Sequence, residues 1–296
     1  MSSKEIPTEL RGRFLEVNMF PLSFKEFLRF KNIKFDFKAI DYSNKQKSEL
    51  FKFLNEFHEY GSLPEIALAE EAKKADIANS YYQTVVRRDI IERYNIKNEE
   101  SLKALLRLLL NSTKYSISKM YNNLKALNYE IGKSTLQNYL NFTENSFFIF
   151  SVPIFSYKIK NQMQYARKNY FIDSVFISKL STKFTKDFGR LYENSVAIEL
   201  KRRDKEFYYW ENPKKQEADF VVVEGTKVKQ LIQVCYSINN LETRKREIRA
   251  LIHASRELKC KNLIVITEDY EKELKEKWFG VKRKIKFIPL WKWLLH

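Results

Sequence analysis

The residues best placed for chemistry in this sequence lie on two neighbouring predicted strands, at 218–223 and 228–235. Asp219 opens the first strand, and the second strand ends with Gln233 and Cys235. In metal-dependent nuclease sites, an acid on one strand is followed by an acid-x-Lys triplet on the next, and the acids hold a divalent cation. Here Gln233 replaces the second acid and Cys235 replaces the lysine. The pattern therefore predicts the shape of such a site with a weakened chemistry.

The composition limits the class of protein. The chain has 296 residues, 44% of them hydrophobic, which is enough for two or three compact units. The net charge of +17 favours a partner with a phosphate backbone, or else a solvated lysine-rich surface. Cys235 and Cys260 are interpreted as small buried residues of a reducing compartment. Because no signal-peptide pattern and no apolar run of roughly 20 residues is present, we expect a cytoplasmic protein without a membrane partner.

The glycines exclude one function for this chain alone. None of the six lies in a GxxxxGK[ST] phosphate loop or in a GxGxxG turn. These are the devices by which backbone amides hold the phosphates of a nucleotide. We therefore do not expect the chain to hydrolyse a nucleotide by itself.

The first half of the chain is predicted to be mostly helical. Ser23, followed by Glu26 three residues later, forms a capping box at the start of a helix. Helical spacing of apolar residues continues from 45 to 93. One face of a further helix carries four leucines at positions typical of a buried face, namely Leu102, Leu105, Leu106 and Leu109.

The next segment is predicted to form a small helical unit with a two-stranded wing. A second helix follows Ser116 or Ser118, and Ser134 is predicted to cap a third. Strands are predicted at 147–152 and 169–172, on either side of a lysine-bearing loop. Three short helices followed by a two-stranded wing with a basic tip describe a winged helix-turn-helix.

The remainder of the chain alternates helices and strands. Helices are predicted at 189–203 and 243–255, and strands at 207–210, 218–223, 228–235, 262–267 and 285–289, before a short C-terminal helix. Alternation of this kind predicts an α/β layer built on a mixed sheet.

Seven stretches spread over the chain carry a resemblance to a known family. They are SSKEIPTELRGRFLEVNMFPLSFKEFL, HEYGSLPEIAL, VVRRDIIERYNI, STLQNYLNFTENSFFIF, RLYENSVAIEL, EADFVVV and LIQVCY. In this order they resemble archaeal-type AAA ATPases that carry a winged helix and a PD-(D/E)xK nuclease-like C-terminal domain. The resemblance covers nearly the whole chain, which begins after the Walker A loop, the Walker B strand and the sensor strand of that family. The chain therefore resembles the C-terminal portion of such a protein.

The resemblance implies a multidomain α and α/β fold. Its parts are a remnant of the AAA core after the sensor strand at 1–30, a helical lid at 31–97, a winged helix-turn-helix at 98–173 and a restriction-endonuclease-like mixed-sheet α/β domain at 174–296. Arg11 and Arg13 match positions that reach the ATP of a neighbouring subunit, unless they form local ion pairs. ATP is thus expected only through a partner or a missing N-terminal portion, and an AAA core is an expected partner.

DNA is a second expected partner, through the helix predicted to begin at Ser134. The residues near its N-terminus that suit phosphates or base edges are Lys133, Ser134, Thr135, Gln137 and Asn138. The basic residues that would hold an adjacent backbone from the wing are Lys158, Lys160, Arg167 and Lys168. The alternative is that the winged helix packs against protein.

The resemblance also assigns the acids. Glu193 resembles the outer acid of the nuclease site, Asp219 the central metal ligand, and Glu217 lies on the same strand face as Asp219. The predicted catalytic residues are Glu193, Asp219 and Gln233, and the predicted ligands of Mg²⁺ or Mn²⁺ are Asp219, Glu193 and Glu217. The cations available to replace the missing lysine are Arg244, Lys245 and Arg246 of the next helix. In the alternative interpretation, Glu193 pairs with Arg190 and Asp219 accepts local amides.

Two functions follow from these patterns. The first is a DNA-binding and assembly portion of an archaeal-type AAA ATPase with a degenerate nuclease-like domain. The second is a divalent-metal-dependent DNA endonuclease with a divergent active site. The Gln233 and Cys235 replacements favour the first, because a thiol does not replace an ammonium at neutral pH.

Overall fold

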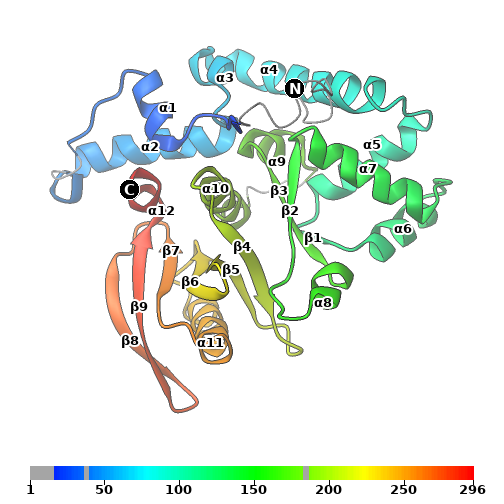
Figure 1. Cartoon of the computed structure of the whole chain (residues 1–296). Helices are drawn as coiled ribbons and strands as arrows, with labels where there is room; N and C mark the ends of the chain where they lie inside the picture. Colours follow the sequence, from blue (N-terminus) through cyan, green and yellow to red (C-terminus); the bar gives the residue numbers. More distant parts are fainter. Residues whose placement is uncertain (1–16, 37–39, 183–186) are drawn as a thin grey trace.

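The computed structural model describes residues 17–36, 40–182 and 187–296. Arg11 and Arg13, and most of the segment predicted as a remnant of the AAA core, lie outside the described residues. The fold is mixed α/β, with a six-stranded sheet, a separate three-stranded sheet and helices around both (Figure 1). The mixed sheet that the alternation predicted is therefore confirmed.

The N-terminal helices lie along one side of the molecule (Figure 1). They are α1 (Phe24–Phe30), the 3₁₀ turn η3 (Ile40–Tyr42), α2 (Asn44–Tyr60), α3 (Pro64–Leu68), α4 (Glu71–Thr84) and the π-helical continuation η4 (Val85–Glu92). The predicted capping box is present, since Ser23 accepts the amide of Glu26 and the Glu26 carboxylate accepts the amide of Ser23. This box fixes the start of α1, whose apolar side packs against α2 and α12 (Leu290–Leu295).

The middle of the chain forms four helices and a three-stranded sheet. Its elements are α5 (Glu99–Leu110), β1 (Lys114–Tyr115), α6 (Ile117–Ala126), α7 (Lys133–Asn145), β2 (Ile149–Val152), α8 (Ile159–Gln164) and β3 (Arg167–Phe171). The strands run in the order β1-β3-β2, and both pairings are antiparallel. The four predicted leucines of α5 are buried. The winged helix-turn-helix itself stays a prediction.

Two local predictions in this segment are wrong. Gly132, not Ser134, is the N-cap of α7, because the extended backbone ends at Gly132 and helical geometry begins at Lys133. The segment predicted as a lysine-bearing loop contains the short helix α8, where the Gln162 amide and the Asn161 backbone amide hydrogen-bond back to 156–158.

The C-terminal part forms the six-stranded sheet. Its elements are α9 (Ser174–Leu180), α10 (Phe188–Arg202), β4 (Glu206–Glu211), β5 (Glu217–Glu224), β6 (Lys227–Cys235), α11 (Leu241–Glu257), β7 (Leu263–Thr267), β8 (Lys272–Trp278), β9 (Val281–Pro289) and α12. The strand order is β4-β5-β6-β7-β9-β8, with β6, β7 and β9 parallel and the other pairings antiparallel. Strand β8 was not predicted, because its sequence KELKEKW has too few apolar residues to indicate a strand.

The hydrophobic core crosses the predicted segment boundaries. One cluster joins Phe24, Phe57, Val196, Phe220 and Trp291, which brings α1 and α2 against α10, the sheet and α12. The helices predicted as a separate lid thus share a core with the six-stranded sheet. The domain boundaries at 30, 97 and 173 stay predictions.

Candidate functional site

A single buried ammonium group lies where three acids converge. The Nζ of Lys168 is 2.7 Å from Glu193 Oε1, 2.6 Å from Glu217 Oε1 and 2.8 Å from Asp219 Oδ1. Lys168 is only 2% exposed. Lys168 was predicted to lie on the surface of the wing and to contact a phosphate, and this prediction is wrong. We call Lys168 with these three acids the lysine–carboxylate cluster.

Three elements bring the lysine–carboxylate cluster together. Strand β3 carries Lys168, helix α10 carries Glu193, and Glu217 and Asp219 lie two residues apart on one face of β5. The side chain of Asn194 fastens β3 to α10, since its Oδ1 accepts the amide of Phe171 at 2.9 Å and its Nδ2 donates to the Phe171 carbonyl at 3.1 Å. The cluster is therefore built between the three-stranded sheet and the six-stranded sheet.

A second lysine completes the charge balance. Lys114 on β1 lies directly opposite Lys168 on β3, a pairing that repels when both side chains are charged. Glu217 lies between the two lysines and accepts hydrogen bonds from both, and Lys114 also pairs with Glu211. The Lys114 ammonium lies 4.4 Å from the ring centroid of Tyr209. The repulsion between the two lysines is thus offset by the carboxylate placed between them.

The side-chain amide of Gln233 is hydrogen-bonded within the protein at both its oxygen and its nitrogen, so its carbonyl is not free. Its Oε1 accepts the backbone amide of Asp219 at 3.2 Å, and its Nε2 donates to Glu247 Oε2 at 2.7 Å. The second oxygen of Asp219 accepts the amide of Val234 at 2.8 Å. Cys235 is buried, and burial raises the pKa of its thiol to about 12, so it stays protonated at neutral pH.

The ionisation of the lysine–carboxylate cluster follows from its burial and its charges. Burial acts to lower the pKa of Lys168, but Asp219, Glu193 and Glu217 outweigh it and hold that pKa well above its usual range. Burial also acts to raise the pKa of Glu217, and Lys168 and Lys114 together keep it below its usual value. For Asp219, burial exceeds the effect of Lys168 and raises the pKa to about 7.

This arrangement does not fit a divalent metal ion. A cation held by Glu193, Glu217 and Asp219 would need the oxygens that Lys168 already engages, and it would meet the ammonium at the same point. Throughout the described ranges, no group of three or more His, Cys, Asp or Glu residues is arranged to hold a metal ion. The predicted metal ligands are gathered in one place, but around a lysine.

The other cations proposed to replace the lysine of the motif are engaged elsewhere. Arg244 pairs with Glu276, Lys245 with Glu242 and Arg246 with Glu247, which also accepts the side-chain amide of Gln233. Arg190 does not pair with Glu193 either, because its guanidinium donates to the carbonyls of Leu109, Leu110 and Ser112. The predicted pair of Glu193 with Arg190 is therefore wrong, whereas the predicted acceptance of a backbone amide by Asp219 is present, through Val234.

Apart from Lys168, the residues predicted to bind DNA reach the surface. Lys133, Ser134, Thr135 and Asn138 at the start of α7 are exposed, as are Lys158 and Lys160 at α8. Gln137 is half-buried and donates to Asn141 Oδ1 at 3.0 Å. These positions leave the side chains accessible, and whether they contact DNA stays a prediction.

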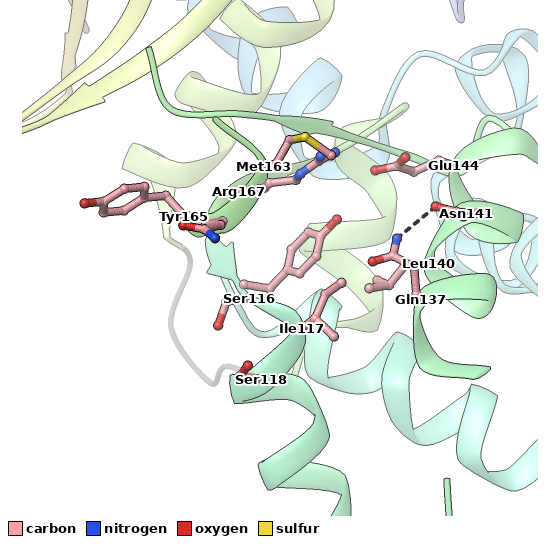
Figure 2. Close-up of a pocket in the computed structure, with 12 residues that line it drawn as sticks. Ser116, Ile117, Ser118, Gln137, Leu140, Asn141, Glu144, Met163, Tyr165 and Arg167 are labelled. Atoms are coloured by element: carbon pink, nitrogen blue, oxygen red, sulfur yellow. Dashed lines mark hydrogen bonds between the residues drawn. The ribbon is translucent and has the colours of Figure 1, made fainter. Parts of the chain in front are cut away.

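A pocket of about 200 Å³ lies between α7, α8, β3 and the start of α6 (Figure 2). Gln137 and Asn141 line it from α7, and Ser116 and Ser118 line it from the start of α6. Figure 2 shows Arg167 and Glu144 together at one end of the pocket. The predicted contact residue Gln137 therefore faces a hollow rather than open solvent.

Sequence reasoning missed Lys168 and Lys114 as partners of the acids. Both lysines are far from Asp219 in the sequence, and the nearer one, Lys168, is 51 residues away. No local sequence motif spans such a separation. Tyr170, whose hydroxyl donates to Glu193 Oε1 at 2.6 Å, was missed as well. The one available signal was the placement of a lysine inside an otherwise buried strand, where an unpaired charge is costly.

Comparison with known proteins gives two domain matches and two relatives. Residues 52–187 match a model described as Domain of unknown function (DUF8612), and residues 188–293 match Domain of unknown function (DUF4143). An uncharacterised protein of Methanocaldococcus jannaschii is 40% identical over 303 residues, which cover 99% of this chain and 66% of that protein. An uncharacterised protein of Haemophilus influenzae is 28% identical over 203 residues, which cover 68% of this chain and 48% of that protein.

The chain spans a little under two thirds of the first relative and about half of the second. Within the described residues, none of the helices combines the length and apolar character needed to cross a bilayer. The chain is thus similar over nearly its whole length to an uncharacterised archaeal protein, and it contains regions that match two domains of unknown function.

Proposed function

We propose that this chain is the DNA-binding and assembly portion of an archaeal-type AAA ATPase, and that its nuclease-like part does not cut DNA. The observation that carries the second half of this proposal is the ammonium of Lys168 at the centre of three carboxylates. Removing Lys168 from that point would leave the buried Asp219 without its counter-ion beside two half-buried acids, which is strongly unfavourable. A metal ion would therefore have to displace a lysine that the fold itself holds in place.

The DNA-binding half of the proposal is supported by charge and by exposure. The chain has a net charge of +17, and Lys133, Lys158 and Lys160 are exposed on or beside the two helices that flank the pocket of Figure 2. No side chain caps the N-terminus of α7, so its first amides are not used by a capping side chain. Such amides and lysines suit the phosphates of a duplex.

Duplex binding can be tested by fluorescence anisotropy with a labelled DNA duplex over a range of salt concentrations. We expect binding at low salt that weakens steeply as salt is added, because bound lysines release condensed counterions. Lys133→Ala combined with Lys160→Ala should lower the slope of log K against log salt by about 0.9 for each lysine that binds a phosphate. The matched control, Lys25→Ala with Lys52→Ala, removes the same charge from α1 and α2. No binding at low salt, or equal effects of both double variants, would contradict the proposal.

Cleavage is tested with supercoiled plasmid and Mg²⁺ or Mn²⁺. We expect no nicking by the wild-type chain. The rival function, a metal-dependent endonuclease, is favoured by one observation, the gathering of Glu193, Glu217 and Asp219. Nicking that requires the metal and disappears in Asp219→Ala would establish the rival and end the proposal of an inactive domain.

A further inference from the structure

The β8–β9 hairpin carries lysines that face other lysines. In the register of this antiparallel pair, Lys275 lies opposite Lys284 and Lys277 lies opposite Lys282. These four side chains are exposed on one face of the hairpin, together with Lys286. Like charges directly opposite each other destabilise a sheet. We call these five residues the lysine face.

Neither ion pairing nor protection of the sheet edge accounts for the lysine face. Of the two acids on the hairpin, Glu273 pairs with Lys284 and Glu276 pairs with Arg244 of α11. In the described part of the chain, Lys275, Lys277, Lys282 and Lys286 form no ion pair. Lysines on an edge strand prevent pairing with other chains. That purpose explains β8, which is the edge, but not β9, which lies between β7 and β8.

The turn of the hairpin exposes an aromatic residue in a strained conformation. Trp278 pairs with Val281, so Phe279 and Gly280 form a two-residue turn in which both φ angles are positive, +43° and +76°. Asn or Asp is the residue preferred before Gly in such a turn, and a bulky side chain is an outlier there. Phe279 is nevertheless 82% exposed. Its ring contributes little to the core, so strain at this position points to a contact outside the chain.

A hollow of about 400 Å³ opens beside the turn. Trp278 and Phe279 line it from the hairpin, and Lys214, His253 and Arg256 line it from the β4–β5 loop and α11. The rings of Trp278 and Phe279 meet edge to face with centroids 4.8 Å apart, and the Arg249 guanidinium lies 4.1 Å from the Trp278 ring. The hollow thus combines aromatic faces with cations at a size that accepts a planar base.

We propose that the β8–β9 hairpin binds single-stranded nucleic acid. The hollow opens on the face of the hairpin that packs against α11, and the lysine face lies on the opposite face, so the two meet only at the turn. Phosphates lie along the lysine face, and the strand passes over the tip of the hairpin, where an unpaired base stacks on the exposed ring of Phe279 at the mouth of the hollow. An exposed aromatic ring at the end of a row of lysines provides the chemistry by which proteins hold single strands without reading sequence. This surface is distinct from α7, which lies on the other side of the molecule (Figure 1). The inference therefore goes beyond the proposed duplex contact and does not depend on it.

The first test replaces the strained aromatic residue. Phe279→Asn installs the residue that this turn prefers, so the fold should keep or gain thermal stability. Affinity for a labelled oligothymidylate, measured by anisotropy, should fall by about tenfold because the variant no longer stacks on a base. Unchanged affinity in a folded Phe279→Asn protein would overturn the role of the turn.

The second test removes two lysines of the lysine face and compares the result with the removal of two lysines elsewhere. Lys277→Thr with Lys282→Thr should weaken oligothymidylate binding and lower its salt slope by about 0.7 for each lysine. Lys25→Ala with Lys52→Ala is the charge-matched control and should leave the slope nearly unchanged. Equal effects of the two double variants would overturn the proposal.

Two further arms separate other partners. If vesicles rich in anionic lipid bind the wild-type chain through Phe279 and oligothymidylate does not, the surface is a membrane contact and the proposal fails. Failure of the duplex proposal would appear instead as duplex binding that is insensitive to Lys133→Ala with Lys160→Ala, while the hairpin variants still change single-strand binding.

Discussion

Lys168 and Lys277 are the same residue type on strands of two different sheets, yet their surroundings are opposite. Lys168 is buried and contacts three carboxylates within 2.8 Å. Lys277 is exposed and faces another lysine. The ammonium of Lys168 is paired with carboxylates inside the fold, whereas the ammonium of Lys277 is accessible to a ligand. A net charge of +17 therefore does not by itself locate a binding surface, because part of the positive charge holds the protein together.

The largest effect is expected at the buried lysine. Lys168→Met leaves Glu193, Glu217 and Asp219 without their common counter-ion and should lower the free energy of unfolding by about 3–5 kcal/mol. Urea denaturation measures it. Lys158→Met, at the exposed start of α8, is the control and should change stability by less than about 0.5 kcal/mol. A change just as small for Lys168→Met would show that the lysine–carboxylate cluster contributes no more than a surface ion pair.

A second variant, in which the acids are neutralised together with the lysine, tests whether the loss of stability comes from the unpaired charges. A variant with Lys168→Met, Glu193→Gln, Glu217→Gln and Asp219→Asn has no buried charge left unpaired at this point. Replacing a whole buried ion cluster costs less than breaking it. We expect it to be more stable than Lys168→Met alone.

The second effect is a pH dependence carried by Asp219. Its pKa is raised to about 7 from 3.8, so between these values the folded state binds a proton that the unfolded state has released. This carboxyl therefore makes stability fall as pH rises through that window. Asp219→Asn removes the dependence, and the stability of the wild type relative to the variant should decrease from about pH 4 to about pH 7.

Urea denaturation at a series of pH values measures this difference. Glu217 contributes in the opposite direction. Its pKa is lowered in the folded state, so it stabilises the fold at pH values above the ordinary pKa of a glutamate. This contribution largely cancels in the comparison, because Glu217 is present in both proteins. Asp76→Asn, at an exposed position of α4, is the control for the loss of one carboxylate. A flat difference for Asp219→Asn would contradict the raised pKa.

The smallest effect is expected on the lysine face. Lys277→Thr removes the repulsion with Lys282 and should raise the free energy of unfolding by about 0.2–1 kcal/mol. Added salt should reduce this gain, because exposed charges are screened. Lys272→Thr is the control, since Lys272 lies opposite Phe287 rather than a lysine. If Lys277→Thr instead destabilises the chain, the lysines support the hairpin and the contrast with Lys168 disappears.

Sequence patterns were sufficient for most elements but not for their partners. The capping box at Ser23 and the leucine face of α5 were predicted, because both depend on neighbours within one helix. Strand β8 was missed because its stability comes from pairing with β9 rather than from its own apolar residues. The N-cap of α7 was displaced by two residues, since a glycine with extended backbone ended the preceding loop earlier than the serine pattern indicated.

The candidate site divides in the same way. The sequence determined that acids would stand on β5 and α10 and that Gln233 and Cys235 would share one face of β6, because these follow from residue type and from the alternation of a strand. Only the tertiary structure decided what the acids contact. The nearest ammonium comes from β3, a strand of another sheet, and no local spacing specifies how two sheets are placed against each other. The sequence gives the charge of a lysine. Whether that charge contacts a carboxylate or solvent depends on packing between segments far apart in the chain.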